Sequence, residues 1–128
     1  MAVRTKWLGR GYESESIDEA AGHTLIGDEP AAIGGFLPLE TVYGYEPVPE
    51  ELGEAEAVHV IGAQANVWTE YMKTPGHVEY MVFPRMFALS EVVWSPKDAK
   101  DYRGFLHRLD WHLDRLDALG VNYRPLDR

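Results

Sequence analysis

Four side chains that could hold a sugar lie close together in the sequence, just after a short apolar run at residues 57–61. They are the carboxamide of Asn66, the indole of Trp68, the carboxylate of Glu70 and the phenol of Tyr71. The apolar face of a pyranose can lie on an indole, and a carboxylate accepts hydrogen bonds from sugar hydroxyls. We therefore expect Trp68 and Glu70 to bind a sugar ring, with Asn66 and Tyr71 as candidates for the pocket rim.

The other reactive residue types form no recognisable catalytic or metal-binding pattern. His107 and His112 are five residues apart, whereas two ligands on one helix face lie four apart. The pair Gly34-Gly35 lacks the rest of a phosphate-binding loop, and no serine stands in a nucleophile-elbow sequence. We expect no metal site and no cofactor.

Three residues further along the chain have structural explanations. Trp94 ends an apolar helical run, so it is expected in the core. Arg85 is expected to be structural rather than to bind a substrate. Glu91 lies on an otherwise apolar stretch, and because a buried carboxylate needs a partner, an ion pair with Arg85 is expected.

The element expected to position the sugar-binding residues is a strand at residues 57–63. Its apolar residues point to more than one side, as in a strand that is covered on both faces. A lone strand cannot satisfy its ladder groups, and the only other strand-like run, at residues 24–26, is weak. We therefore expect this strand to belong to a sheet whose other members are missing.

Helices are expected on the carboxyl side of that strand. Thr74 can cap a helix whose first residue is Pro75, and Pro84 should kink or restart it. The clearest helical pattern runs from about residue 99 to residue 119, where apolar residues recur at steps of three and four. Gly120 is a suitable residue to end that helix.

Residues 1–53 have weaker signals. Residues 1–30 look weakly structured, with a capping-box spacing that allows a short helix at residues 16–21. Residues 31–53 read as a loop region with one short helix after Pro38. So long a loop in a compact domain is either functional or has lost the partner on which it packs.

Bulk properties limit the classes of partner. The 128 residues carry a formal net charge of -9 and no cysteine. An acidic chain repels phosphate backbones and anionic lipids, so neither nucleic acid nor a membrane surface is expected as a partner. No run approaches about 20 apolar residues, and the start does not read as a signal peptide. The compartment stays unknown.

Three stretches together resemble one enzyme family, the family-20 glycoside hydrolases or β-N-acetylhexosaminidases. The central stretch, GAQANVWTEYMKTPGHVEYMVFPRMFALSEVVWS, is similar to the unit that closes their catalytic barrel. PAAIGGFLPLETVYGYEPVP resembles the stretch that precedes this unit, and FLHRLDWHLDRLDALGVNYRP resembles the final barrel helix and the turn after it. The resemblance covers about residues 29–126.

This resemblance implies an α/β fold. The family fold is a (β/α)8 TIM barrel, which needs about 250 residues, so 128 residues cannot form one. We expect residues 29–128 to be the C-terminal part of the catalytic domain, with the last strand and the terminal helices. As an isolated chain it should be mostly helix and loop. Residues 1–28 match the family poorly.

The resemblance also implies an activity and two site residues. Family members remove terminal, non-reducing N-acetylhexosamine from glycans by a retaining mechanism in which the substrate assists. Trp68 corresponds to the wall of the sugar pocket, and Glu70 to an acceptor for hydroxyls at its far side. The family's catalytic Asp-Glu pair belongs to an H-x-G-G-D-E motif. Residues 23–29 read H-T-L-I-G-D-E, one residue too long and one glycine short, so Asp28-Glu29 is interpreted as an ordinary acidic turn.

Two expectations and one alternative follow. The catalytic pair is expected to be missing from this chain, so the isolated chain should be inactive. Its uncovered apolar faces and orphan strand should favour self-association. The alternative is a non-catalytic helical carbohydrate-binding or interaction module that uses Trp68 and Glu70 without chemistry.

Overall fold

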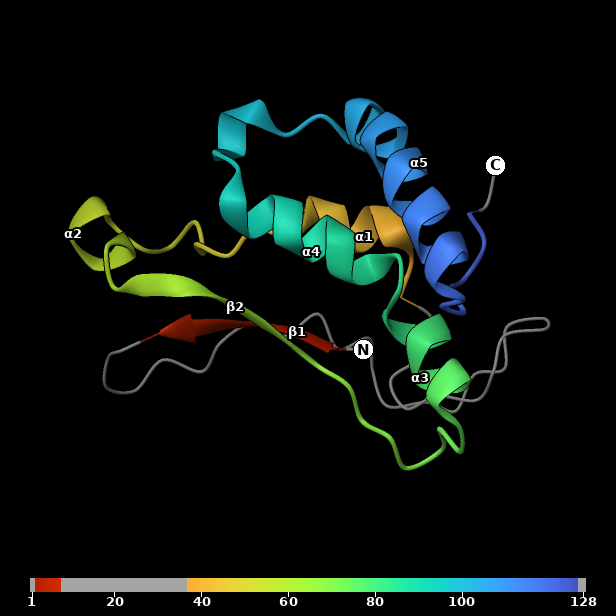
Figure 1. Ribbon diagram of the computed structural model, residues 1–128. Coiled ribbons are helices and arrows are strands. Elements are labelled where there is room, and N and C mark those ends of the chain that lie inside the picture. The colour runs from red at the N-terminus through yellow and green to blue at the C-terminus, as the bar shows by residue number, and fades with distance from the viewer. Residues whose placement is uncertain (1, 8–36, 127–128) are drawn as a thin grey trace.

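The structure is a computed structural model that describes residues 2–7 and 37–126. A two-stranded sheet lies beneath a layer of helices, and the longest helix crosses one end of that layer (Figure 1). In chain order the elements are β1 (Ala2–Trp7), α1 (Leu39–Gly44), α2 (Glu54–Ala57), β2 (Val60–Asn66), α3 (Pro75–Val82), α4 (Arg85–Trp94), the 3-10 helix η1 (Lys97–Ala99) and α5 (Tyr102–Leu119). The expected helix at residues 16–21, the weak strand at 24–26 and the acidic turn at Asp28-Glu29 lie outside the described residues.

The helix boundaries on the carboxyl side of β2 follow the predicted signals. The Thr74 hydroxyl accepts a hydrogen bond from the His77 amide (3.1 Å), and Pro75 is the first residue of α3. The helix ends at Val82, and α4 begins after Pro84. The predicted cap at Thr74 and the predicted restart at Pro84 are therefore confirmed. The helix restarts at Pro84 because proline cannot donate the hydrogen bond that would continue α3.

The longest helix, α5, is confirmed with a later start than expected. Residues 97–99 form the 3-10 turn, and the Asp101 carboxylate then caps α5 by accepting from the Gly104 amide (3.0 Å). Its predicted apolar stripe is buried at Phe105, Leu109, Leu113 and Leu116.

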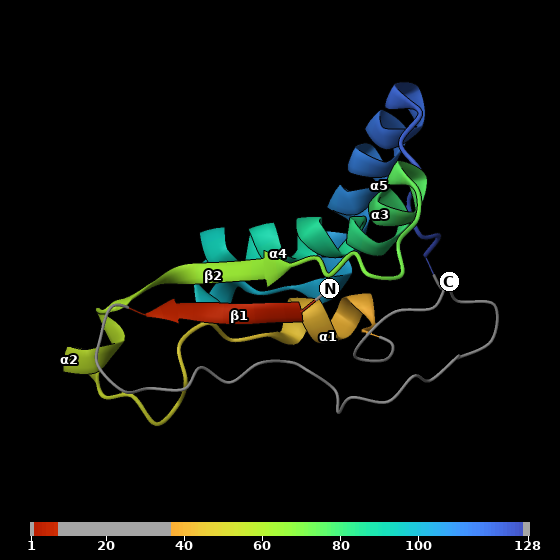
Figure 2. The same ribbon diagram turned by 90° about the horizontal axis from the view of Figure 1, so that it is seen from below.

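The core lies where α1, α4 and α5 meet. Val42 and Leu109 are fully buried, and the side chains of β2 that pack against this cluster are Ala63 and Ala65. The small alanine side chains let α4 lie close over β2, as both views of the ribbon show (Figures 1 and 2). The buried cluster consists of Val42, Tyr43, Ala88, Leu89, Val92, Phe105, Leu109, Leu113 and Leu116.

The predicted strand starts three residues too early. Residues 54–57 form α2 because Glu56 caps it: its carboxylate accepts a hydrogen bond from the Gly53 amide (3.1 Å). The strand proper is β2, Val60–Asn66. This capping hydrogen bond stabilises a helical turn before the strand, although the residues that follow the turn have high β-propensity.

The expectation of a strand without a partner is wrong. β1 pairs with β2 in antiparallel register, from Ala2 opposite Asn66 to Trp7 opposite Val60, with an irregularity at Lys6/Trp7. There Gly62 has a φ of 148°, a conformation that glycine adopts far more readily than other residues. The sequence signal for β1 was its two β-branched residues, Val3 and Thr5, in alternation with charges, a pattern typical of a half-exposed strand.

Gly120 gives a first testable prediction. Its φ of 67° is left-handed, and no atom lies within 4 Å of where a Cβ would be. Gly120→Ala should therefore cost about 1 kcal/mol through backbone strain alone. Gly44→Ala is the matched control, because Gly44 has equal space and no positive φ. Urea unfolding of both variants measures the difference, and equal free energies of unfolding would contradict the prediction.

Candidate functional site

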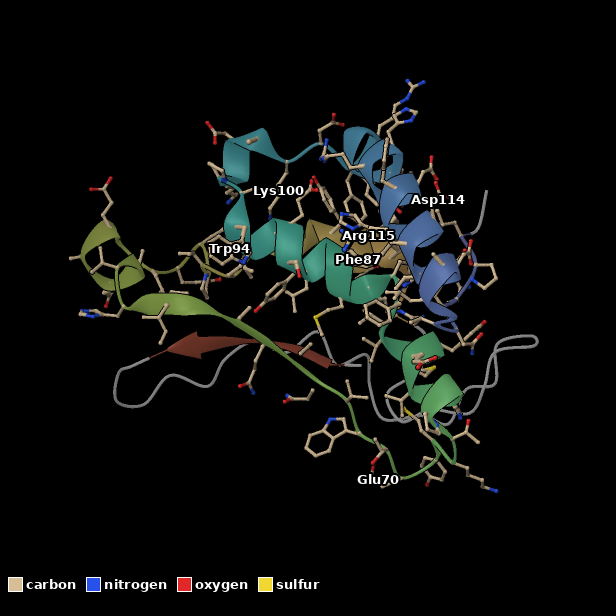
Figure 3. The ribbon with its side chains drawn as sticks, viewed as in Figure 1. Glu70, Phe87, Trp94, Lys100, Asp114 and Arg115 are labelled. Atoms are coloured by element: carbon tan, nitrogen blue, oxygen red, sulfur yellow. The ribbon has the colours of Figure 1, made fainter. Side chains whose placement is uncertain are left out.

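The four predicted sugar-binding residues all lie at the carboxyl end of β2 or just after it. Asn66 is the last residue of β2, and the other three follow within five residues in the loop that leads to α3. Figure 3 shows Glu70 on this loop, directed away from the helices. This end of a strand is where residues face the reaction site in α/β barrels.

The exposure of these side chains suits ligand binding. Trp68 is 52% exposed, so about half of its surface faces solvent and the rest is covered by the protein. Glu70 is exposed and Tyr71 is 44% exposed. Asn66 is half-buried, and its side-chain oxygen accepts a hydrogen bond from the Gln64 amide group (3.3 Å). The loop therefore exposes an aromatic side chain and a carboxylate within three residues of each other.

Trp94 corrects a sequence expectation, because it is 88% exposed and not in the core. The buried stripe of α4 is Arg85, Ala88, Leu89 and Val92. Trp94 comes two residues after Val92, which turns it about 200° around the helix axis. The apolar run of the sequence thus continues past the point where the helix face turns to solvent.

Arg85 is structural, as expected, but its described partners differ from those predicted. The guanidinium is buried and donates to the backbone carbonyls of Leu37 (2.7 Å) and Met81 (3.0 Å). The expected ion pair with Glu91 is wrong. Glu91 comes six positions after Arg85 on α4, which turns its side chain about 240° around the helix axis from that of Arg85.

Glu91 instead joins three helices. Its carboxylate accepts hydrogen bonds from the Tyr43 hydroxyl of α1 (2.9 Å) and from the guanidinium of Arg108 in α5. The Tyr43 hydroxyl in turn accepts from the Asp101 amide (2.9 Å). No sequence signal predicts this network, because its members come from segments that only folding brings together.

The network shifts the pKa values of its members, including Tyr43 and Glu91. Burial, and then the nearby Glu91 carboxylate, raise the pKa of Tyr43 despite the opposing hydrogen bond from Asp101. Burial alone would raise the pKa of Glu91, but the hydrogen bonds from Arg108 and Tyr43 outweigh it and hold that pKa below its ordinary value. Glu91 is therefore ionised at neutral pH.

A pH-dependent loss of stability follows from this shift. A carboxyl group with a lowered pKa in the folded state stabilises fully above its ordinary pKa of 4.5, and this contribution is lost as the pH falls through the folded value. Arg108→Met should lower the thermal midpoint at pH 7, with a smaller difference from wild type at pH 3. Arg115→Met removes a charge from the same helix outside this network and should leave the midpoint near wild type. Circular dichroism melts test this, and an equal gap at both pH values would contradict it.

A separate hollow of about 430 Å³ lies where the first turns of α1, α4 and α5 meet. Its lining includes Glu40, Tyr102, Asp110 and Arg124, and none of the four predicted sugar-binding residues. In residues 2–7 and 37–126, no cluster of three or more acidic or histidine side chains is arranged to hold a metal ion. Over the same residues, no helix is long and apolar enough to cross a bilayer.

Comparisons with known proteins agree on one family. Residues 18–97 match the family described as "Glycosyl hydrolase family 20, catalytic domain". A β-hexosaminidase from Porphyromonas gingivalis is 47% identical over 95 residues, which is 74% of this chain and 12% of that protein. A β-N-acetylhexosaminidase from Cellulomonas fimi is 32% identical over 95 residues, 70% of this chain and 18% of that protein.

Solved structures show the same relationship. A family-20 exo-β-N-acetylglucosaminidase from Vibrio harveyi, solved in complex with N-acetylglucosamine, matches with a TM-score of 0.63 and 40% identity, over 70% of this chain and 14% of that chain. The family-20 β-N-acetylhexosaminidase from Streptomyces coelicolor matches with a TM-score of 0.68 and 28% identity, over 78% of this chain and 20% of that chain. This chain thus spans less than a quarter of each of these four proteins. The predicted resemblance is confirmed: the chain belongs to glycosyl hydrolase family 20, whose catalytic domain residues 18–97 match.

Proposed function

We propose that residues 29–128 are the C-terminal part of the catalytic domain of a β-N-acetylhexosaminidase. The complete enzyme removes terminal, non-reducing N-acetylhexosamine from glycans. The observation that carries this proposal is the pairing of a half-exposed Trp68 with an exposed Glu70 just past the carboxyl end of β2. The 47% identity over 95 residues to a β-hexosaminidase supports it.

Trp68 and Glu70 recognise different parts of the sugar. Trp68 offers an indole face on which the apolar face of a pyranose can lie. Glu70 is an acceptor-only group when ionised, so it selects hydroxyl donors. A hydrogen bond to such a charged group contributes about 1.5–3 kcal/mol. Asn66 and Tyr71 contribute to the rim of this pocket.

The bond cleavage itself requires groups from the rest of the barrel. In the proposed reaction, the acetamide oxygen of the substrate attacks the anomeric carbon while the glycosidic bond breaks. An Asp orients the acetamide, and the adjacent Glu donates a proton to the leaving oxygen and later removes one from the attacking water. Neither role falls to a residue of 37–126, where the contribution is to hold the terminal sugar.

A chimera tests the proposal. Residues 37–126 replace the corresponding stretch of the Vibrio harveyi enzyme, and hydrolysis of a chromogenic N-acetylglucosaminide is measured. We expect turnover by the chimera and none by the isolated chain. Turnover by the isolated chain at the rate of a full enzyme would refute the proposal. A folded but inactive chimera that still binds N-acetylglucosamine would favour the non-catalytic module.

A further inference from the structure

The turn that follows α5 is hydrogen-bonded to α3, the helix to which the loop carrying Trp68 and Glu70 leads. The side-chain amide of Asn122 donates to the Gly76 carbonyl oxygen (2.7 Å), and its backbone amide donates to the Glu79 carboxylate (2.9 Å). Both ribbon views show α3 beside α5 (Figures 1 and 2). One residue near the carboxyl end of the chain therefore contacts both the first and the second turn of α3.

The helix α3 depends on contacts from other segments for its position. It has eight residues and buries one of them, Met81. Isolated helices shorter than about 12 residues are barely stable in water, so packing and hydrogen bonds from outside must hold such a helix. Met81 lies in the last turn, whereas Gly76 lies in the first. The Asn122 side chain thus holds the end of α3 that is nearer to the sugar-binding loop.

Neither backbone conformation nor burial explains an asparagine at position 122. Asparagine is common where φ is positive, but in the part of the chain that the structure describes only glycines have a positive φ. Asn122 is also exposed, so it fills no space in the core. The left-handed Gly120 and the hydrogen bond from the Val121 amide to the Leu116 carbonyl (3.0 Å) end α5 just before it. The contact with α3 is the remaining explanation for this side chain.

The position of α3 is transmitted directly to the proposed sugar-binding loop. Thr74 caps α3 and is also the last residue of the loop. Within the loop, the Met72 amide donates to the Thr69 carbonyl oxygen (3.0 Å), which closes a turn beside Glu70. The other end of the loop is fixed by β2. Because a binding site needs its side chains held to within about 0.5 Å, movement of α3 should loosen the grip on the sugar.

We propose that Asn122 is a positioning residue, which fixes the first turn of α3 and thereby keeps Trp68 and Glu70 in place for the terminal sugar. This inference rests on the proposed function. Asn122 acts through α3 and the loop, and makes no contact with the sugar itself.

Amide hydrogen exchange, measured by NMR at pH 7 on the full 128-residue chain, tests the positioning without any substrate. Asn122→Asp keeps the shape of the side chain but replaces the amide donor by a carboxylate, which cannot donate to the Gly76 carbonyl. Tyr123→Phe is the matched control. It removes a hydrogen bond made by the same turn, from the Tyr123 hydroxyl to the Asp117 carboxylate of α5 (3.3 Å), and leaves the contacts with α3 in place.

Asn122→Asp should speed exchange of the Met72 and His77 amides about tenfold, as expected for the loss of one hydrogen bond. The amide of the buried Leu109 in α5 should keep its wild-type rate, and Tyr123→Phe should leave all three amides unchanged. Wild-type exchange in Asn122→Asp would overturn the inference. Equal acceleration at Leu109, or in Tyr123→Phe, would also overturn it, because the effect would then be a general loss of stability.

Kinetics of the chimera then test what the positioned loop does. Asn122→Asp should raise KM for the N-acetylglucosaminide about tenfold with little change in kcat, because it loosens the groups that hold the sugar and not those that break the bond. An active chimera whose KM does not respond to Asn122→Asp would overturn the inference. If the parent chimera folds but has no activity, the proposed function fails, and the exchange experiment alone decides whether Asn122 positions the loop.

Discussion

Glu70→Gln in the chimera should lower kcat/KM for an N-acetylglucosaminide about tenfold to a hundredfold. The substitution keeps the shape of the side chain and removes its charge, so it weakens charged hydrogen bonds worth about 1.5–3 kcal/mol. Because Glu70 is proposed to hold hydroxyls remote from the bond that breaks, most of the loss should appear as a higher KM. Steady-state kinetics over a range of substrate concentrations measure the two constants separately.

The control for this experiment is Glu54→Gln. Glu54 is an exposed carboxylate in the first turn of α2, outside the loop that follows β2. Its loss should leave both constants within twofold of the parent chimera, by the ordinary behaviour of surface substitutions. If Glu70→Gln also left kcat/KM unchanged, Glu70 would have no part in holding the sugar.

Leu109→Ala should cost about 2–5 kcal/mol of unfolding free energy, the largest stability effect expected in this chain. Leu109 is 0% exposed and belongs to the core cluster formed by α1, α4 and α5. Truncation to alanine removes buried methyl groups and leaves a cavity that the surrounding helices can fill only in part. Since whole domains are stable by about 5–15 kcal/mol, much of the variant should be unfolded under mild denaturing conditions.

Leu119→Ala is the matched comparison for Leu109→Ala. Both residues are leucines of α5, but Leu119 is 73% exposed at the last turn. Its truncation should change the unfolding free energy by no more than about 0.5 kcal/mol. Urea unfolding followed by circular dichroism gives both values, and similar losses would mean that the packing of α5 differs from that described.

Local sequence signals were sufficient to predict the helices from residue 74 onward. Thr74, Pro75 and Pro84 act within a few residues, through one capping hydrogen bond and the missing amides of two prolines, so the sequence alone places the boundaries of α3 and α4. The stripe of α5 is equally local, because its period is set by the geometry of the helix itself. The motif around Trp68 and Glu70, too, was identifiable from the sequence.

Contacts between distant segments could not be predicted from the sequence. The pairing of β1 with β2 joins residues some 60 positions apart, and nothing in residues 2–7 specifies that partner. The Tyr43–Glu91–Arg108 network depends on where α1, α4 and α5 meet. The exposure of Trp94 depends on where the helix turns away from the core, although its apolar neighbours predict burial.

The sequence by itself determined the family, through stretches that match in order along the chain. It also determined the helix boundaries near residues 74–95 and the candidate sugar-binding pair, because these depend on residues close together along the chain. Only the tertiary structure decided which face of each helix is buried, which carboxylate meets which arginine, and which apolar side chains remain uncovered. The physical reason is that packing joins surfaces assembled from distant segments. The energy of such contacts depends on residues from several segments, so no single stretch of residues predicts it.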